Sequence, residues 1–433
     1  MKKLYRTRNK AQEPVRPCCL FMHVEFIAYP FLFVAIYFEV FLLLTFLGTH
    51  GRTSRARLLA THTPRVAIIV PCWNEETTIA GTVESLLALD YPADCLEIIL
   101  VNDGSTDGTP AAMDVFQGVP QITILHKENG GKHTAINRGI EMARDAEIIG
   151  CLDADSFVAP GALREMIAYF DDTKVAAVTP AMSALNPRNP LERMQNAEYI
   201  FGIGWRHALA LVNGIFVTPG PFSMYRKSVI DELGGFRYAH QAEDMEMALR
   251  MQRHGWHIEN APKARVYTKV PKTFFKLIKQ RTRWTTGFLR NVLLDYRDLV
   301  GNPKHKVLGL MVLPFGFLAV SGGIILFCVA IYMTASQLVT TVATVSGVPL
   351  AYILTPHFSL GWFYIPITFL ILLGLVASGI SITFMILGKR ISETEGNLWL
   401  DMIAYCLLYG LVAPWWLLRS VADVTFGTHR SWR

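Results

Sequence analysis

The longest uncharged stretch limits what this chain can fold into more than any other feature. From Val307 to Gly388 the sequence contains no Asp, Glu, Lys or Arg. A membrane-spanning helix needs about 20 apolar residues, so this run can hold at least two spans. The sequence therefore predicts an integral membrane protein, of the plasma membrane or a bacterial inner membrane, with spans at 307–333 and 361–388.

A second apolar stretch precedes the rest of the chain. It runs from Cys18 to Gly48 and is interrupted only by Glu25 and Glu39. It is too long for the core of a signal peptide, and no small-residue cleavage site follows it, so we expect a retained anchor. This predicts a span at 20–48 behind a basic N-terminal segment at 1–19.

A third apolar stretch, Met402 to Leu418, ends at Arg419 and predicts a span at 399–419, with 421–433 as a tail. About four spans are then expected in total. The mean hydropathy of +0.30 agrees with this class, because it is too high for a soluble enzyme of this length.

The segment 60–271 has the composition of a globular domain. Short β-branched runs alternate there with helical patterns, which indicates an α/β fold with a mostly parallel sheet. The predicted strands are VAIIVP (66–71), EIILVND (97–103), ITILH (122–126) and EIIGCLDAD (147–155). Ligands of such sheets gather at the carboxyl ends of the strands, and three of these runs end in polar residues. These residues are Asn74, Glu75, Asp103, Asp153 and Asp155.

The distribution of charge predicts the orientation. The uncharged loop at 334–360 is expected outside and Lys389 with Arg390 inside, which places the globular domain in the cytoplasm. Basic residues near the N-terminus would favour the opposite orientation, and the chemistry expected of the domain decides between the two. The net charge of +6 comes partly from residues beside the spans, where cations meet lipid headgroups, so no nucleic-acid partner is indicated.

Two acidic pairs could carry chemistry. Asp153 and Asp155 follow a strand and are hard oxygen ligands of the kind that Mg²⁺ or Mn²⁺ prefers, although Asp155 could instead cap the next helix. Glu243 and Asp244 begin a helical pattern. One of them could be a general base, although acids in a first turn often only complement the helix dipole.

Two glycine-containing loops lie between these pairs. VNDGSTDGT (101–109) is either a turn or a loop whose Asp103 contacts a nucleoside, and its later positions do not match a calcium loop. NGGKHTAIN (129–137) places Lys132 at a helix start, where it could meet a phosphate.

The segment 272–300 mixes basic and aromatic residues and predicts amphipathic helices along the bilayer surface. Within it, KQRTRWTTGF places a polar cluster beside the first predicted span. Headgroup contacts and an aromatic belt would explain it, but Arg also suits phosphate oxygens and an indole suits stacking on a sugar. The cluster consists of Gln280, Arg281, Arg283 and Trp284.

In this order the motifs resemble those of the membrane-embedded family 2 glycosyltransferases, inverting enzymes that include hyaluronan, chitin, poly-N-acetylglucosamine and cellulose synthases. The resemblance runs from Arg65 to Trp284 and rests on PCWNEE, NDGS, the DxD of Asp153, TPGPFSMYR (218–226), the Glu243–Asp244 pair and QRTRW. It implies a GT-A nucleotide-diphospho-sugar transferase domain. The form of the 218–226 loop is closest to the hyaluronan and chitin-oligosaccharide branch.

The resemblance also implies a role for each matching residue. Asp155, with Asp153, would bind Mg²⁺ or Mn²⁺; Asp244, beside Glu243, would be the base; and Trp284, Gly220 and Pro221 would contact the acceptor. The implied donor-binding residues are Pro71, Asn74, Glu75, Asp103, Lys132, Asp153, Gln280, Arg281 and Arg283.

These roles imply a processive enzyme that transfers sugar from a UDP-sugar, favouring UDP-N-acetylglucosamine, to a growing β-linked glycan. The alternatives are transfer of one sugar to a membrane lipid, and a nucleotide-binding membrane protein without activity. Ala242 stands where many members of the family carry Thr or Gly. Four spans are fewer than the larger synthases have, which leaves open a homo-oligomer or an accessory secretion subunit.

Overall fold

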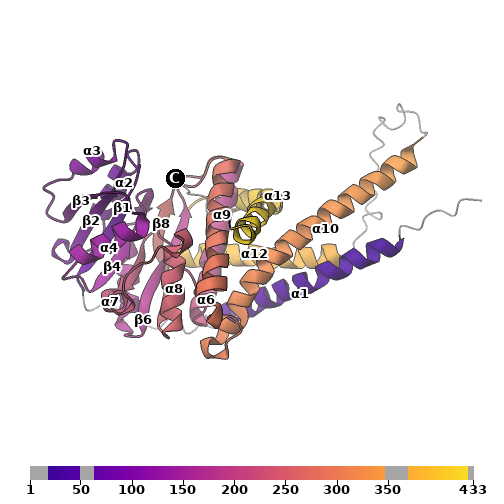
Figure 1. Cartoon of the computed structure of the whole chain (residues 1–433), viewed down its shortest axis with the longest axis horizontal. Coiled ribbons are helices and arrows are strands. Elements are labelled where there is room, and N and C mark those ends of the chain that lie inside the picture. The colour runs from indigo at the N-terminus through magenta and orange to yellow at the C-terminus, as the bar shows by residue number, and fades with distance from the viewer. Residues whose placement is uncertain (1–17, 49–62, 347–368, 428–433) are drawn as a thin grey trace, which may run out of the picture.

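The computed structural model describes residues 18–48, 63–346 and 369–427. A domain built on a β-sheet lies at one end of the molecule, and long helices extend from it (Figure 1). The strands are β1 Val66–Cys72, β2 Leu96–Asp103, β3 Ile122–Lys127, β4 Ile148–Cys151, β5 Ser156–Val158, β6 Val175–Ala184, β7 Ser223–Arg226 and β8 His257–Thr268. The helices of the domain are α2 Ile79–Leu87, α3 Thr109–Asp114, α4 Lys132–Met142, α5 Ala162–Ile167, α6 Pro190–Leu211, α7 Lys227–Leu233, α8 Glu243–Arg253 and α9 Phe274–Arg290.

The strands form one sheet in the order β3-β2-β1-β4-β7-β6-β8-β5. Within the group β1 to β4, every pair of neighbouring strands is parallel, as the alternating pattern predicted. β6 is also parallel to β8. β7 runs antiparallel between β4 and β6, and β5 runs antiparallel to β8. The four predicted strands are confirmed. The other four were not predicted. Of these, β5 and β7 are very short, and β6 is buried throughout and so shows no alternation.

Parallel strands place their carboxyl ends at one edge of the sheet. Cys72 pairs with Asn102 on β2, and Ile69 pairs with Cys151 on β4, so β1, β2 and β4 end side by side. The polar residues that follow these strands therefore meet at one edge, as the sequence predicted.

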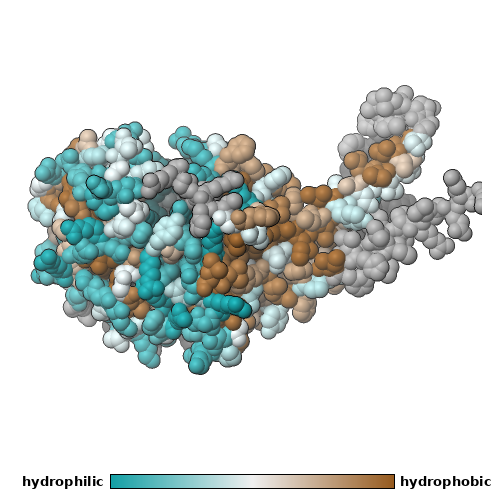
Figure 2. Space-filling view, viewed as in Figure 1, coloured by the Kyte–Doolittle hydropathy of each residue, from teal (hydrophilic) through white to brown (hydrophobic). Residues whose placement is uncertain are grey.

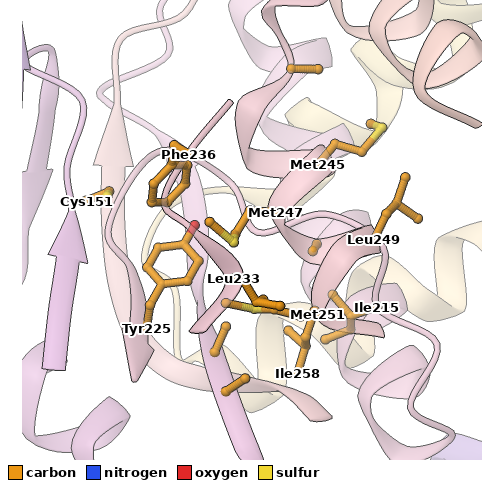
Figure 3. Packing of buried hydrophobic residues seen from close by; sticks show 14 of the residues in the cluster. Cys151, Ile215, Tyr225, Leu233, Phe236, Met245, Met247, Leu249, Met251 and Ile258 are labelled. Atoms are coloured by element: carbon orange, nitrogen blue, oxygen red, sulfur yellow. The ribbon is translucent and has the colours of Figure 1, made fainter. Parts of the chain in front are cut away.

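Apolar side chains fill both faces of the sheet. One cluster joins the sheet to α2 and α5, and the other joins it to α4, α7 and α8. In the second cluster Met247 and Met251, one turn apart on α8, pack toward Tyr225 and Ile258 respectively (Figure 3). This cluster continues through Phe288 of α9 into the long helices, so the domain and these helices share a core.

Among the residues that the structure describes, four helices are long and apolar enough to cross a membrane, which agrees with the expected number and with an integral membrane protein. They are α1 Cys18–Gly48, α10 Leu313–Val345, α12 Phe369–Ser392 and α13 Leu398–Thr425. Apolar residues gather over these helices, whereas the surface of the domain is mainly hydrophilic (Figure 2). Residues 361–368, the first part of the span predicted at 361–388, lie outside the described residues, as do residues 1–17 of the basic N-terminal segment.

α10 leads away from the domain and α12 leads back to it (Figure 1). Just beyond α12, Glu393 pairs with Lys263 of β8 at 2.6 Å. Lys389 and Arg390 therefore lie on the same side as the domain, and the positive-inside rule predicts that this side is the cytoplasm. The segment predicted as amphipathic helices begins with α9 and continues in short helical turns at 291–295 and 297–299.

Candidate active site

A cavity of ≈ 790 Å³ opens at the carboxyl ends of β1, β2 and β4 and is covered on one side by α9. Most of the predicted site residues line it. Those from the sheet edge are Pro71, Glu75, Asp103, Asp153 and Asp155, and those from helices are Lys132, Glu243, Gln280 and Arg283. The structure thus brings together residues that are up to 212 positions apart in the sequence (71 to 283).

Lys132, at the start of α4, joins the two acidic motifs. Its Nζ lies 2.6 Å from Asp153 Oδ1 and 3.5 Å from Glu243 Oε1. Burial alone would lower the pKa of Lys132, but Asp153, Glu243 and Asp244 outweigh burial and raise this pKa above its ordinary value. The lysine is therefore a permanent positive charge, and by contacting both acids it fixes the distance between the carboxyl ends of the strands and the start of α8.

Asp155 lies among other acids. Burial, followed by the charges of Asp153 and Glu75, raises the pKa of Asp155 to about 7. A divalent cation would relieve this crowding, and carboxylates are the ligands that Mg²⁺ and Mn²⁺ prefer. No group of three or more ligating side chains gathers in the part of the chain that the structure describes. Asp153 and Asp155 are the two carboxylates that could serve as such ligands here.

Asp103 is almost completely buried and shapes the wall of the cavity. Its carboxylate accepts hydrogen bonds from Lys127 Nζ at 2.6 Å, Gly130 N at 3.0 Å and Gly131 N at 2.9 Å. It fixes the loop that leads to Lys132, and its acceptor positions are largely used in doing so.

Asn74 does not line the cavity, although it was predicted to bind the donor. Its backbone has a φ of 57°, in the left-handed region that Asn tolerates. Its side-chain oxygen accepts the Thr106 N–H at 2.8 Å, and its own N–H donates to Ser105 Oγ. Asn74 therefore orders the neighbouring turn, and it is the preceding residue, Trp73, that faces the cavity.

Gly220 and Pro221 lie behind the cavity rather than in its lining. A Cβ on Gly220 would stand 2.8 Å from both Lys132 Nζ and Asp153 Oδ2. Only glycine therefore lets this loop support the Lys132–Asp153 pair. The predicted acceptor contact of these two residues is not tested by this arrangement.

The segment that enters α8 is held in an unfavourable conformation. Ala239, His240 and Gln241 have φ values of 45°, 55° and 64°, which non-glycine residues rarely adopt in succession. The residue that follows α9 holds this segment in place, because Asn291 Nδ2 donates a hydrogen bond to Ala239 O at 3.1 Å. This places Glu243 in the lining of the cavity, with Asp244 directly after it.

Asp244 is partly buried at the first turn of α8. Its Oδ1 accepts the Met245 N–H at 2.8 Å. Burial and then the charge of Glu243 raise the pKa of Asp244 to about 6, against the lowering effect of Lys132. A carboxylate with this pKa can accept a proton near neutral pH.

The residues of QRTRW divide between two faces of α9. Lys276, Lys279, Gln280 and Arg283 recur at intervals of three and four and line the cavity. Arg281 points to the other face, where it binds Glu198 Oε2 of α6 at 2.9 Å, and its guanidinium lies 4.3 Å from the centre of the Trp284 ring. Neither Arg281 nor Trp284 lines the cavity. The donor contact predicted for Arg281 is replaced by this buried ion pair, because helix geometry turns the residue away from the site.

A comparison with protein families decides what kind of site this is. The family model described as "Glycosyltransferase like family 2" matches residues 64–287, from just before the first strand into the last turn of α9. The chain belongs to glycosyltransferase family 2.

The curated relatives of this chain agree with its assignment to the family. Poly-beta-1,6-N-acetyl-D-glucosamine synthase of Staphylococcus epidermidis is 31% identical over 301 residues, covering 68% of this chain and 72% of the relative. The enzyme of the same name from Staphylococcus aureus strain COL is 33% identical over 253 residues, covering 58% and 60%.

Among solved structures, the mannosyltransferase PcManGT of Pyrobaculum calidifontis, determined with GDP-Man and Mn²⁺, superposes with a TM-score of 0.58. It is 22% identical, and the match covers 94% of this chain and 100% of that one. This likeness confirms the expected GT-A-like fold with its attached helices.

Sequence reasoning missed several residues that line the cavity of this glycosyltransferase. They are Trp73, His133, Tyr238, Gln241, Lys276 and Lys279. Spacing could have revealed the two lysines, since Lys276 stands four positions before Gln280 and Lys279 four positions before Arg283 on one helix. Tyr238 and Gln241 carried no such signal, because only the folded segment before α8 brings them to the site.

Proposed function

We propose that this glycosyltransferase polymerises N-acetylglucosamine from UDP-N-acetylglucosamine into a β-linked polysaccharide, which leaves across the membrane between the long helices. The proposal is supported by the two synthases named above, which are at least 31% identical to this chain. The observation that carries it is Lys132, which ties the aspartates of the sheet edge to the acidic start of α8 within one cavity.

The donor would lie with its nucleoside against the loops after β1 and β2, near Trp73 and Asp103. Its diphosphate would meet Arg283 and the two lysines of the same face of α9, since guanidinium and ammonium groups bind phosphate oxygens. Asp155 and Asp153 would hold Mg²⁺ or Mn²⁺, which when bound neutralises charge on the leaving diphosphate. Lys132 already pairs with Asp153, so Asp155 is the freer ligand.

The transfer step needs a base on the acceptor side. Asp244 would take the proton of an acceptor hydroxyl, whose oxygen then forms a bond to the anomeric carbon of the donor sugar. The bond from that carbon to the UDP oxygen breaks on the opposite face, so the configuration inverts and UDP leaves with the electron pair. Arg283 would stabilise the charge that develops on UDP.

The acceptor glycan would approach from the membrane side. Trp284 follows the cavity residues of α9 and packs beside Tyr199 and Val270. It would offer its ring to the sugar that has just been extended. The domain would face the cytoplasm, where nucleotide sugars are available, in agreement with Lys389 and Arg390 at its side of α12.

Asp244→Asn tests the assignment of the base. The variant should bind UDP with wild-type affinity, because its shape is preserved, while the transfer rate should fall about 10²- to 10⁴-fold. Binding is measured by calorimetry, and transfer by release of UDP. Asp145→Asn, at an exposed site far from the cavity, is the matched control. Substantial residual transfer by Asp244→Asn would show that the base is another group, with Glu243 the first to examine.

A further inference from the structure

The segment before α8, with its three successive positive φ values, is fixed on both sides. On one side, the Phe236 ring packs edge-on against Tyr225 in the core (Figure 3). The side chain of Asn137 also bonds both the N–H and the C=O of Phe236, each at 2.8 Å. On the other side, His240 Nε2 lies 3.2 Å from Asp295 Oδ2. A strained backbone persists only where the surrounding structure imposes it, and such places cluster at functional sites.

This segment supplies two side chains to the cavity. Tyr238 and Gln241 both line it, and so does His133, the second residue of α4. The rings of Tyr238 and His133 are in contact, with their centres 5.9 Å apart and their planes at 73°. Together Tyr238, Gln241 and His133 form one wall of the cavity, here named the entry wall.

The entry wall contains a polar group that the rest of the protein does not use. The side-chain amide of Gln241 makes no hydrogen bond with any residue that the structure describes. A glutamine amide offers one acceptor oxygen and a nitrogen with two donor hydrogens. Lys132 and Glu243, which also line the cavity, contact each other instead. Gln241 is therefore available to a ligand in both of its roles, as donor and as acceptor.

The position of the donor sugar follows from the proposed function, on which this inference rests. A diphosphate held by a cation at Asp155 and an anomeric carbon facing an acceptor at Asp244 place the sugar between these two residues. Gln241 stands three positions before Asp244. His133 directly follows Lys132, which contacts both acidic motifs. The entry wall therefore flanks the space that the sugar would occupy.

We propose that the entry wall is the subsite that recognises the acetamido group at C2 of the donor sugar. The Gln241 amide would donate to the acetamido carbonyl and accept the acetamido N–H. The rings of Tyr238 and His133 would cover the methyl group, because aromatic faces bury apolar groups well. Glucose carries only a hydroxyl at C2 and has no methyl group there. The entry wall would thus select UDP-N-acetylglucosamine over UDP-glucose.

Substitution of Gln241 tests this subsite in the purified full-length enzyme with Mn²⁺. Gln241→Met keeps the length of the side chain and removes both hydrogen-bonding groups. The KM for UDP-N-acetylglucosamine should rise about tenfold, which corresponds to the loss of one or two neutral hydrogen bonds. The inhibition constants of UDP and of UDP-glucose against this reaction should stay within about twofold of wild type, because neither ligand carries an acetamido group. Gln117→Met, at an exposed turn, is the matched control and should leave all three values unchanged.

Tyr238→Ala tests the apolar part of the same subsite. Tyr238 is 57% exposed, so the protein should fold without its ring. The KM for UDP-N-acetylglucosamine should rise about threefold, because the methyl group loses apolar contact. The inhibition constants of UDP and UDP-glucose should again change little.

The two ligands without an acetamido group separate the other outcomes. Equal weakening of all three ligands by Gln241→Met would mean that the entry wall contacts the nucleotide or only positions α8. An unchanged KM in this variant would mean that Gln241 does not contact the donor. Either result would overturn the subsite and leave the proposed donor intact. If the wild-type enzyme did not use UDP-N-acetylglucosamine at all, the proposed function would fail together with the subsite.

Discussion

The acidic pair at the start of α8 makes activity depend on pH. Burial and Glu243 raise the pKa of Asp244 from an ordinary 3.8 to about 6. A base acts only when it is deprotonated, so kcat should be level above this pKa and fall about tenfold per pH unit below it. The measurement is kcat for UDP release at saturating donor from pH 4.5 to 8.

Glu243→Gln provides the internal check on this pH profile. Removing the negative charge of Glu243 also frees Lys132 to act on Asp244, and both changes favour the ionised form. The acidic limb of the profile should therefore move to lower pH. If kcat of the wild type fell only near pH 4, or if Glu243→Gln left the acidic limb of the profile where it is in the wild type, Asp244 would not be the titrating group.

Gly220 is a second residue whose effect can be measured. In Gly220→Ala the new Cβ would lie 2.8 Å from Lys132 Nζ and Asp153 Oδ2, so this pair must shift. We expect kcat/KM to fall roughly 10- to 100-fold with little loss of folded protein, since displacement of about 1 Å in a site costs this much. Gly161→Ala is the control, because a Cβ there meets nothing within 4 Å. Equal activity of the two variants would contradict the role of the pair.

At the scale of the element, α9 shows where sequence reasoning succeeds and where it stops. The motif QRTRW predicted that polar residues of this helix serve the site, and Gln280 and Arg283 do line the cavity. A motif does not say which face each residue takes, and the burial of Arg281 depends on Glu198, which is distant in sequence. Helical spacing separates the two faces only once the helix boundaries are known.

The contact between α9 and the entry to α8 should control catalysis. A Cβ on Gly287 would lie 2.6 Å from the Cβ of Ala242, the residue before Glu243. Gly287→Ala favours the helix by up to about 1 kcal/mol, yet it should lower kcat about tenfold, because α8 must move away from the cavity. The measurements are kcat and the affinity for UDP, which should change little.

The reciprocal change provides the control for this contact. Ala242→Gly removes the opposing methyl group, so the double variant with Gly287→Ala should recover most of the lost kcat. A loss that the second substitution does not recover would mean that Gly287→Ala acts elsewhere.

At the scale of the whole molecule, the sequence predicted the strands at the sheet edge and the long helices, because both depend on local apolar patterns. It did not predict α6 as a long helix between sheet and membrane. Gly204 of α6 and Gly388 of α12 meet there at backbone distance, where a Cβ on Gly204 would stand 2.7 Å from Phe384 O. Composition shows that a residue is apolar, but it leaves open whether lipid or protein covers that residue, and for this reason the packing of α6 against α12 could not be predicted.

The most direct test of the proposed function is the size of the product. Purified full-length protein in lipid nanodiscs is given UDP-N-acetylglucosamine or UDP-glucose, with Mn²⁺ or with a chelator, and the glycan is sized while UDP is counted. We predict a high-mass glycan from UDP-N-acetylglucosamine, with one UDP released for each sugar added, and no product with the chelator. A single sugar transferred to lipid, or UDP binding without consumption of sugar, would contradict the account.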